Sequence, residues 1–219
     1  MSKVARICDA LDDRYGKKQW ADRGPVLDEL IRTVLSQNTT AGNCAEAFKK
    51  LRQRFPAWED ARDARWQEIA QAIRSGGLAN RKAPRIRAIL SEIDERGGVL
   101  DLEWIADLAD SEALDYLMAF EGVGRKTAAC VLMFALGRSV LPVDTHVHRV
   151  ATCLGLIGKV DADKAHDLLQ QLVPPERVYS FHVNTVLHGR QICRARRPQC
   201  DRCAIRRNCD YFVEKGGLR

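Results

Sequence analysis

A lysine beside a glycine turn and an aspartate further along the chain are the residues best suited to covalent chemistry. Gly122-Val123-Gly124-Arg125-Lys126 stands between two apolar stretches, and Asp144 follows eighteen residues after Lys126. An amine attacks an electrophilic carbon once it has lost its proton, and a carboxylate stabilises positive charge that develops at that carbon. The pair therefore predicts covalent catalysis next to a turn that binds phosphate.

Two α-helices are expected on either side of the glycine turn. Apolar residues at 113, 114, 117 and 118 have helical spacing, and a second apolar stretch spans 127–136. Glycines 122 and 124 accept positive φ and allow a tight turn, so the second helix begins with free N–H groups that attract phosphate. Arg125 and Lys126 stand at this positive helix end, which disfavours cations and favours a neutral amine. We therefore interpret Lys126 as a nucleophile; the alternative is that it only binds phosphate.

Asp144 precedes a third stretch with helical spacing, residues 145–151. Aspartate is a favoured N-cap residue, so its carboxylate is expected to accept hydrogen bonds from the first turn of that helix. A purely structural role is the alternative to a catalytic one. Capping would also hold the carboxylate in place, so both roles are compatible.

Four cysteines near the C-terminus have the spacing of metal ligands. Cys193, Cys200, Cys203 and Cys209 form the pattern C-x6-C-x2-C-x5-C. Zinc sites usually contain two closely spaced pairs, whereas only Cys200 and Cys203 form one here, and four thiolates suit an iron–sulfur cluster. An iron–sulfur cluster is the preferred interpretation and zinc the alternative. The remaining cysteines are expected to be buried core residues: Cys8, Cys44, Cys130 and Cys153.

Helical periodicity runs through almost the whole sequence and sustained strand alternation is absent, which predicts an all-α fold. Gly137 is expected to end the second hairpin helix. Beyond the helices named above, the spacing predicts helices at 26–35, 45–51, 66–73, 85–93, 104–108, 163–172 and 179–188.

The chain is basic, with a formal charge of +6 and a pI near 9.0 over 219 residues. This balance favours a polyanionic partner. Arginines surround the cysteine motif with Asp201 as the single acid among them: Arg190, Arg194, Arg196, Arg197, Arg202, Arg206 and Arg207. A second basic group contains Arg81, Lys82, Arg85 and Arg87. No apolar run reaches the roughly eighteen residues of a membrane span, and no secretory signal is evident, so we expect a cytoplasmic protein.

The glycine turn, the Val143-Asp144-Thr145-His146 segment and the four cysteines together resemble the endonuclease III family of helix-hairpin-helix DNA glycosylases. The resemblance covers most of the chain in order. It implies that Lys126 is the Schiff-base lysine, that Asp144 is the essential aspartate and that the cysteines bind a 4Fe-4S cluster. It also implies a monomer, located at the nucleoid of a prokaryotic cell, that acts on double-stranded DNA with damaged bases or abasic sites.

The family's fold implies two helical domains. A six-helix barrel carrying the helix-hairpin-helix motif would cover residues 25–136. An iron–sulfur cluster domain would combine residues 1–24 with 137–219. The active site would lie in the cleft between them.

The implied activity is that of a bifunctional DNA glycosylase and AP lyase of base excision repair. Lys126 would displace an oxidised pyrimidine such as thymine glycol, and β-elimination would then cut the strand. Leu78 and either Gln37 or Asn38 would fill the gap left by the flipped nucleotide, while Gly122, Val123, Gly124 and Arg125 would bind the DNA backbone.

Two departures from the family pattern leave alternatives open. Glu121 replaces the proline that usually precedes Gly122 in the family and adds negative charge near the phosphate site, and Ser36-Gln37-Asn38 differs from the usual Ser-Ala-Gln. A monofunctional mismatch or uracil-type glycosylase is one alternative. The other is a DNA-binding iron–sulfur protein without catalysis.

Overall fold

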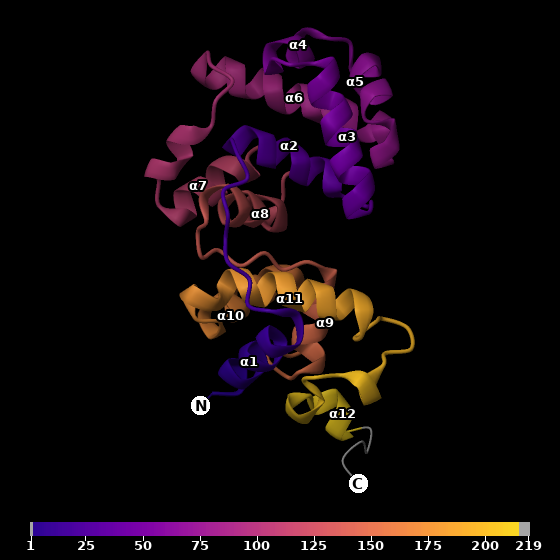
Figure 1. Cartoon of the computed structure of the whole chain (residues 1–219). Coiled ribbons are helices and arrows are strands. Elements are labelled where there is room, and N and C mark those ends of the chain that lie inside the picture. Colours follow the sequence, from indigo (N-terminus) through magenta and orange to yellow (C-terminus); the bar gives the residue numbers. More distant parts are fainter. Residues whose placement is uncertain (1, 215–219) are drawn as a thin grey trace. The chain divides into compact units, whose positions relative to one another are not determined.

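The computed structural model describes residues 2–214, so the last five residues of the predicted cluster domain, 215–219, lie outside the described part. Only helices, turns and loops occur within 2–214, which confirms the all-α class (Figure 1). The chain forms two compact units. We call Asp22–Leu136 the hairpin unit, and Met1–Ala21 with Gly137–Arg219 the cysteine unit.

The hairpin unit contains seven α-helices and two short 3₁₀ helices within its described residues. In chain order they are α2 (Val26–Ser36), α3 (Ala41–Arg54), α4 (Trp58–Asp63), α5 (Trp66–Ala72), η1 (Arg74–Gly76), α6 (Ala79–Gly97), η2 (Glu103–Asp107), α7 (Asp110–Met118) and α8 (Arg125–Leu136).

Helix α2 lies at the core of the hairpin unit and packs against α3, α6 and α8. Its apolar residues Leu30, Ile31, Val34 and Leu35 are all fully buried. These positions cover more than one side of a helix with 3.6 residues per turn, so α2 needs neighbours on several sides. Helix α8 is buried to a similar degree, and it begins directly after the glycine turn.

Two predicted elements of the hairpin unit differ from the structure, and α4 was not predicted. The helix expected at 85–93 begins earlier, at Ala79, and Pro84 lies inside it. Proline at this position removes one hydrogen bond, to the carbonyl of Asn80, and Asn80 is exposed, so water can bind that carbonyl instead. The helix expected at 104–108 is the short 3₁₀ helix η2, in which only Ile105 is buried.

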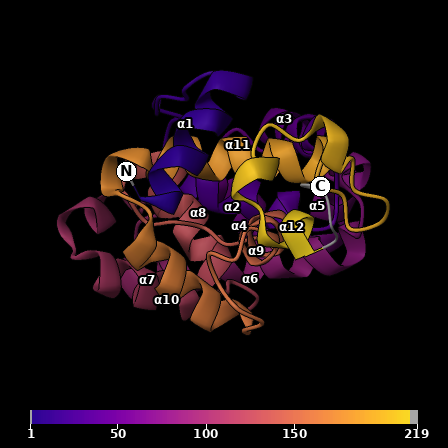
Figure 2. The same ribbon diagram turned by 90° about the horizontal axis from the view of Figure 1, so that it is seen from below.

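The cysteine unit combines the two ends of the sequence. Its helices are α1 (Lys3–Tyr15), α9 (Thr145–Cys153), α10 (Ala162–Leu172), η3 (Pro175–Arg177), α11 (Val178–Gln191), η4 (Cys200–Arg202), η5 (Arg206–Asn208) and α12 (Asp210–Glu214). Helix α11 packs against both α1 and α9, and α12 lies beside α9 (Figure 2).

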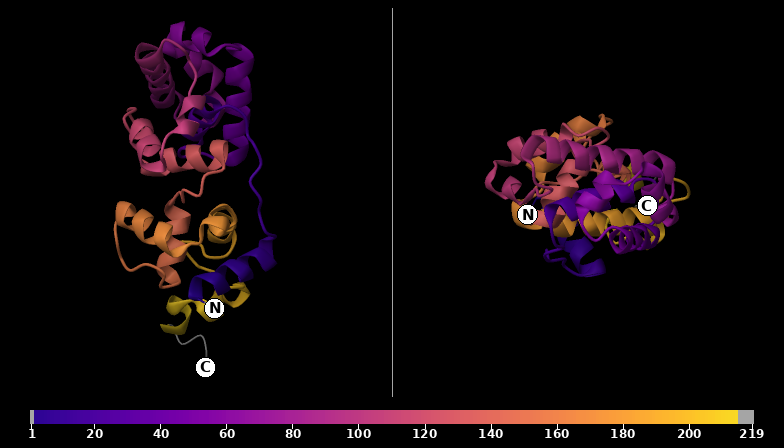
Figure 3. Two further views of the ribbon diagram at one scale, coloured as in Figure 1. Left: turned by 90° about the vertical axis from the view of Figure 1, so that its left-hand side faces the viewer. Right: turned by 90° about the horizontal axis from the view of Figure 1, so that it is seen from above.

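Buried polar contacts fasten α1 to the C-terminal part of this unit. Asn184 of α11 is fully buried and donates to Asp12 Oδ1 at 2.9 Å and to the Gly16 carbonyl at 3.1 Å. Near the two ends of the described chain, Arg6 Nε donates to Asn208 Oδ1 at 3.2 Å. Segments from opposite ends of the sequence therefore lie side by side (Figure 3).

Among residues 2–214, none of the helices combines the length and the apolar character that crossing a bilayer demands.

Candidate functional site

The glycine turn between α7 and α8 has the geometry of a phosphate-binding hairpin. Gly122 has φ +76°, a conformation that side-chain-bearing residues rarely adopt. Val123 is buried at the centre of the turn, and its amide donates to the Phe120 carbonyl at 3.1 Å. Gly124 accepts from the amides of the third and fourth residues of α8 and so starts the helix. The two helices predicted on either side of the glycine turn are therefore present.

Lys126 occupies the first turn of α8 and is half-buried. It lies within electrostatic reach of Glu29 of α2, because its positive charge, like those of Arg32 and Arg23, favours the ionised form of that carboxyl group. Burial outweighs these charges and raises the pKa of Glu29 above its usual range. The Lys126 amine is therefore half-buried and lies in the electrostatic field of a buried acid.

Glu29 is a residue that sequence reasoning missed. It is 3% exposed, and its carboxylate lies 3.6 Å from Arg32 and 3.9 Å from Arg23, but its Oε2 atom has no hydrogen-bond partner among the described residues. A buried unsatisfied polar atom is costly and is often found at functional sites. The sequence did contain a sign of it, because Glu29 is an acidic residue on the apolar face of α2, between Leu27 and Leu30.

Lys82 corrects the interpretation of the second basic group. It is 2% exposed rather than facing solvent, and its Nζ atom donates to the Leu35 carbonyl at 2.6 Å and to the Gly76 carbonyl at 3.0 Å. It therefore ties the end of α2, next to the Gln37 loop, to the loop that carries Leu78. Lys82 therefore stabilises the interior of the hairpin unit and does not contact phosphate.

Arg85 connects three of the predicted DNA-binding segments. Its Nη1 atom donates to Gln37 Oε1 at 3.1 Å, and Gln37 Nε2 donates to the Gly122 carbonyl at 3.4 Å. A methyl group added at Gly122 would lie 2.1 Å from Arg85 Nε. The Gln37 loop, the start of α6 and the glycine turn thus form one connected surface within the hairpin unit.

Asn38 and Leu78 share an unusual backbone. Their φ angles are 53° and 52°, in the left-handed region, which costs a leucine about 1–2 kcal/mol and an asparagine less. Both side chains are exposed, and Leu78 keeps 46% of its surface accessible. Strain and exposure of an apolar side chain point to a role in binding. Gln37, in contrast, is already hydrogen-bonded at both ends of its amide.

Asp144 is the N-cap of α9, as predicted. Its Oδ1 atom accepts from the amides of His146 at 2.9 Å and Val147 at 2.8 Å. The side chain is half-buried. Lys126 belongs to the hairpin unit and Asp144 to the cysteine unit, so each is positioned by its own set of helices.

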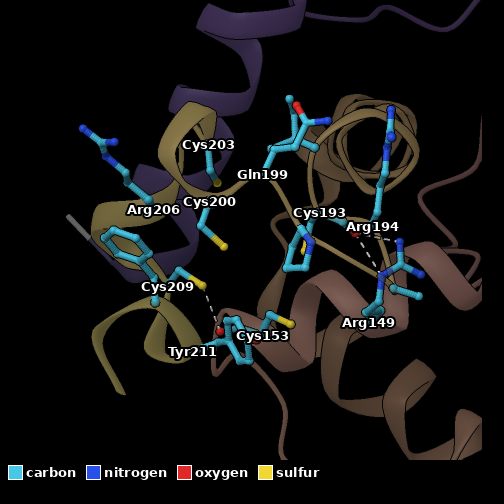
Figure 4. Close-up of a pocket in the computed structure, with 14 residues that line it drawn as sticks. Arg149, Cys153, Cys193, Arg194, Gln199, Cys200, Cys203, Arg206, Cys209 and Tyr211 are labelled. Carbon is cyan, nitrogen blue, oxygen red and sulfur yellow. Dashed lines mark hydrogen bonds between the residues drawn. The ribbon is translucent and has the colours of Figure 1, made fainter. Parts of the chain in front are cut away.

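The four predicted cluster ligands line one cavity of the cysteine unit, with a volume of about 260 Å³ (Figure 4). Cys193 follows α11, Cys200 begins η4, Cys203 follows η4, and Cys209 precedes α12. Among residues 2–214, no three His, Cys, Asp or Glu side chains stand at the mutual spacing of a formed metal site. The structure brings the four thiols to one cavity without showing what they bind.

Cys153 was wrongly assigned to the core. Cys8, Cys44 and Cys130 are buried as expected, whereas Cys153 lines the same cavity as the four motif cysteines. It is the last residue of α9, which packs against α11 and α12. Spacing along the sequence gave no sign of this, because Cys153 is forty residues before Cys193 and reaches the cavity only through helix packing.

A histidine of α11 contacts one of the cavity cysteines. His188 is buried, and burial lowers its pKa to about 4, so its ring is neutral at pH 7. Its Nδ1 atom lies 3.0 Å from the Tyr15 hydroxyl and its Nε2 atom 3.4 Å from Cys203 Sγ. Because a neutral imidazole has one N–H, a hydrogen bond from Tyr15 to Nδ1 leaves Nε2–H to donate to the sulfur.

Comparison with known proteins places these features in context. The model of the HhH-GPD superfamily base excision DNA repair protein matches residues 31–175. A candidate DNA glycosylase of Arabidopsis thaliana is 41% identical over 169 residues, which make up 77% of this chain and 57% of that protein. Endonuclease III of Thermotoga maritima is 32% identical over 187 residues, covering 85% of this chain and 84% of its own.

Two solved structures resemble the whole fold. A non-covalent endonuclease III–DNA complex has a TM-score of 0.83, and a trapped endonuclease III–DNA covalent intermediate has a TM-score of 0.81. Each protein is 26% identical to this chain, and each comparison covers 99% of both chains.

Proposed function

This chain belongs to the HhH-GPD superfamily of base excision DNA repair proteins, and on that basis we propose that it is a bifunctional DNA glycosylase and AP lyase. The resemblance to endonuclease III drawn from the motifs is confirmed by the comparisons. The observation that carries the proposal is the lysine at the start of α8, behind a glycine turn, in a chain similar to an endonuclease III trapped covalently on DNA. Its substrate is double-stranded DNA with damaged bases or abasic sites.

In the proposed reaction the neutral amine of Lys126 attacks C1′ of the flipped nucleotide. A C–N bond forms as the glycosidic bond breaks, and the base leaves with the electron pair and takes up a proton. The remaining N–H proton then passes to O4′ as the C1′–O4′ bond breaks, which opens the sugar ring and gives a Schiff base. Removal of a C2′ proton then expels the 3′ phosphate by β-elimination. Removing the base first requires extrusion of its nucleotide, which costs a few kcal/mol and less for a damaged pair.

Asp144 is the proposed electrostatic partner of this reaction. Because Oδ1 accepts both helix amides, the carboxylate is fixed in place, and neither of these two hydrogen bonds uses Oδ2. A fixed negative charge stabilises the positive charge that develops on the sugar ring without reorganisation. It also receives or returns protons during elimination.

Asn38 and Leu78 are the proposed gap-filling residues. Both are exposed and strained, whereas Gln37 is held by Arg85 and by the glycine turn. We therefore propose that Asn38 fills the gap left by the flipped nucleotide and that Gln37 stabilises the loop that carries Asn38. Leu78 is the apolar wedge, a type of side chain that DNA-bending proteins insert between base steps. The glycine turn and Arg125 bind the phosphate backbone.

A 4Fe-4S cluster is the proposed cofactor, with Cys193, Cys200, Cys203 and Cys209 as ligands. The residues fit the group: four thiols reach one cavity, and Arg149, Arg194 and Arg206 on its wall offset the negative charge of a thiolate cluster. One tetrahedral zinc ion, with Zn–S bonds of about 2.3 Å, needs far less space than this cavity. When bound, the cluster crosslinks residues 193–209 and so holds their arginines in place for DNA.

The nucleophile is tested by trapping. Borohydride reduces a Schiff base to a stable amine, so wild-type protein should become covalently joined to duplex DNA with an abasic site. Lys126→Gln should lose trapping and strand cleavage by roughly 10³-fold or more, because a covalent mechanism fails without its nucleophile. The measurement is the shifted band on a denaturing gel.

Lys164→Gln is the matched control, since Lys164 is an exposed lysine of α10. It should trap as well as wild type. Base release by Lys126→Gln without strand cleavage would indicate a monofunctional glycosylase, and equal trapping by both variants would refute the role of Lys126.

Substrate preference is tested with duplexes that differ in one base. We propose oxidised pyrimidines such as thymine glycol as preferred substrates. Glu121 is exposed beside the glycine turn and adds negative charge near the DNA backbone, so weaker binding to undamaged duplex is expected. Preferential cleavage at G·T or G·U mismatches would identify a mismatch-type glycosylase instead.

A further inference from the structure

The cluster cavity contains one more thiol than a 4Fe-4S cluster requires. Cys153 lines it together with Cys193, Cys200, Cys203 and Cys209 (Figure 4). The four motif cysteines lie on one short segment of the chain, whereas Cys153 comes from the end of α9. Cys153 is therefore held by a helix that carries none of the four motif cysteines.

Cys153 is placed between two of the motif cysteines. Its side chain and that of Cys193 both line the cavity (Figure 4). On its other side, Cys209 Sγ donates to the carbonyl of Cys153 at 3.2 Å. The Cys153 thiol therefore lies in the same cavity as the motif thiols, next to the Cys193 and Cys209 positions.

Arg149 holds Cys153 and Cys193 together through backbone atoms. It lies on α9, one helical turn before Cys153, and its Nε and Nη2 atoms donate to the Cys193 carbonyl at 3.0 and 2.8 Å. Nη2 also donates to the Gly189 carbonyl at 2.9 Å. Since both acceptors are carbonyls, truncation of the Cys193 side chain leaves the connection between α9 and the end of α11 intact.

We propose that Cys153 is a reserve ligand of the cluster and takes the place of Cys193 when that thiol is lost. The proposal rests on the 4Fe-4S cluster proposed above. In the exchange, the Cys153 thiol gives its proton to water, and its thiolate forms the Fe–S bond that Cys193 otherwise makes. The cluster then keeps four thiolate ligands and the same net charge.

The test measures iron, acid-labile sulfide and visible absorbance in the purified full-length protein. Cys193→Ala should keep four irons per chain because Cys153 replaces the lost thiol, and Cys153→Ala should keep them because all four motif thiols remain. The double variant should lose most of its iron, and so should Cys200→Ala, because the Arg149 hydrogen bonds tie α9 to the Cys193 backbone and not to that of Cys200. Mössbauer spectroscopy of Cys193→Ala should show a four-iron cluster rather than a three-iron one.

Cys130→Ala is the matched control, since Cys130 is a buried cysteine of α8 in the hairpin unit, and it should keep all its iron. Far-UV circular dichroism confirms that each variant is folded. Loss of iron from Cys193→Ala alone would overturn the exchange, as would equal iron in Cys193→Ala and the double variant. Wild-type protein without iron would overturn both the exchange and the cluster, so the two failures are distinguishable.

Discussion

At the scale of single residues, Asp144 allows catalysis and folding to be separated. Asparagine caps helices as well as aspartate does, because it has the same acceptor oxygen. Asp144→Asn should therefore keep both hydrogen bonds to the start of α9 and change the free energy of unfolding by less than about 0.5 kcal/mol. It should lower base release by about 10²–10⁴-fold, because the charge is gone.

The measurement is single-turnover glycosylase kinetics beside thermal unfolding. Asp144→Ala serves as the comparison, since it removes the cap and should destabilise by about 1 kcal/mol. If Asp144→Asn released the base at the wild-type rate, the role of Asp144 would be structural only.

Single residues also show where sequence reasoning succeeded and where it could not. The cap at Asp144 was predictable, because capping depends on neighbours along the chain. The burial of Lys82 and the cavity position of Cys153 were not, because each depends on packing between helices distant in sequence. Glu29 was overlooked although helical spacing relates it to Arg32, three residues later, because its burial and its second charge partner, Arg23, depend on tertiary packing.

At the scale of elements, α6 begins at a strained backbone position, Leu78, which is also a proposed DNA-binding residue. Leu78 is the N-cap of α6 in the left-handed conformation, where glycine is favoured. Leu78→Gly should therefore raise the free energy of unfolding by up to about 1 kcal/mol. The same substitution should weaken the binding of damaged DNA and slow base release, because the apolar wedge is missing.

Chemical denaturation and DNA affinity measure the two effects. Leu172→Ala is the control, since Leu172 of α10 is exposed to a similar extent, at 43%. It should affect neither base release nor DNA affinity. A Leu78→Gly variant that is less stable but fully active would show that Leu78 is a packing residue.

Most elements followed from periodicity, and the exceptions have physical causes. The hairpin helices, α2, α9 and α10 coincide with their predicted stretches within a few residues. Pro84 led to a late start for α6, although a proline near an exposed helix start is tolerated. Residues 104–108 showed helical spacing but form a 3₁₀ turn, since only Ile105 has a buried site to fill.

At the scale of the whole molecule, the basic residues predict how DNA binding depends on salt. Arg196 and Arg207 are exposed and belong to the segment that carries the four motif cysteines. Each phosphate contact contributes about 0.9 to the slope of log affinity against log salt. Arg196→Gln and Arg207→Gln should each reduce that slope by about one and weaken binding to all duplexes equally.

Fluorescence anisotropy over a salt series measures the slope. Lys164→Gln again provides the control, because it changes net charge by the same amount at an exposed site of the same unit. Equal changes in all three variants would mean that overall charge, and not local contact, sets the affinity.

The packing of α1 against α11 has a consequence for the order in which the chain folds during synthesis. The hairpin unit is a continuous segment and can fold as soon as it leaves the ribosome. Helix α1 is translated before the hairpin unit, yet its partners Asn184 and Arg177 are made much later. The apolar face of α1 must therefore stay uncovered until α11 has been translated, long after the hairpin unit has had time to fold.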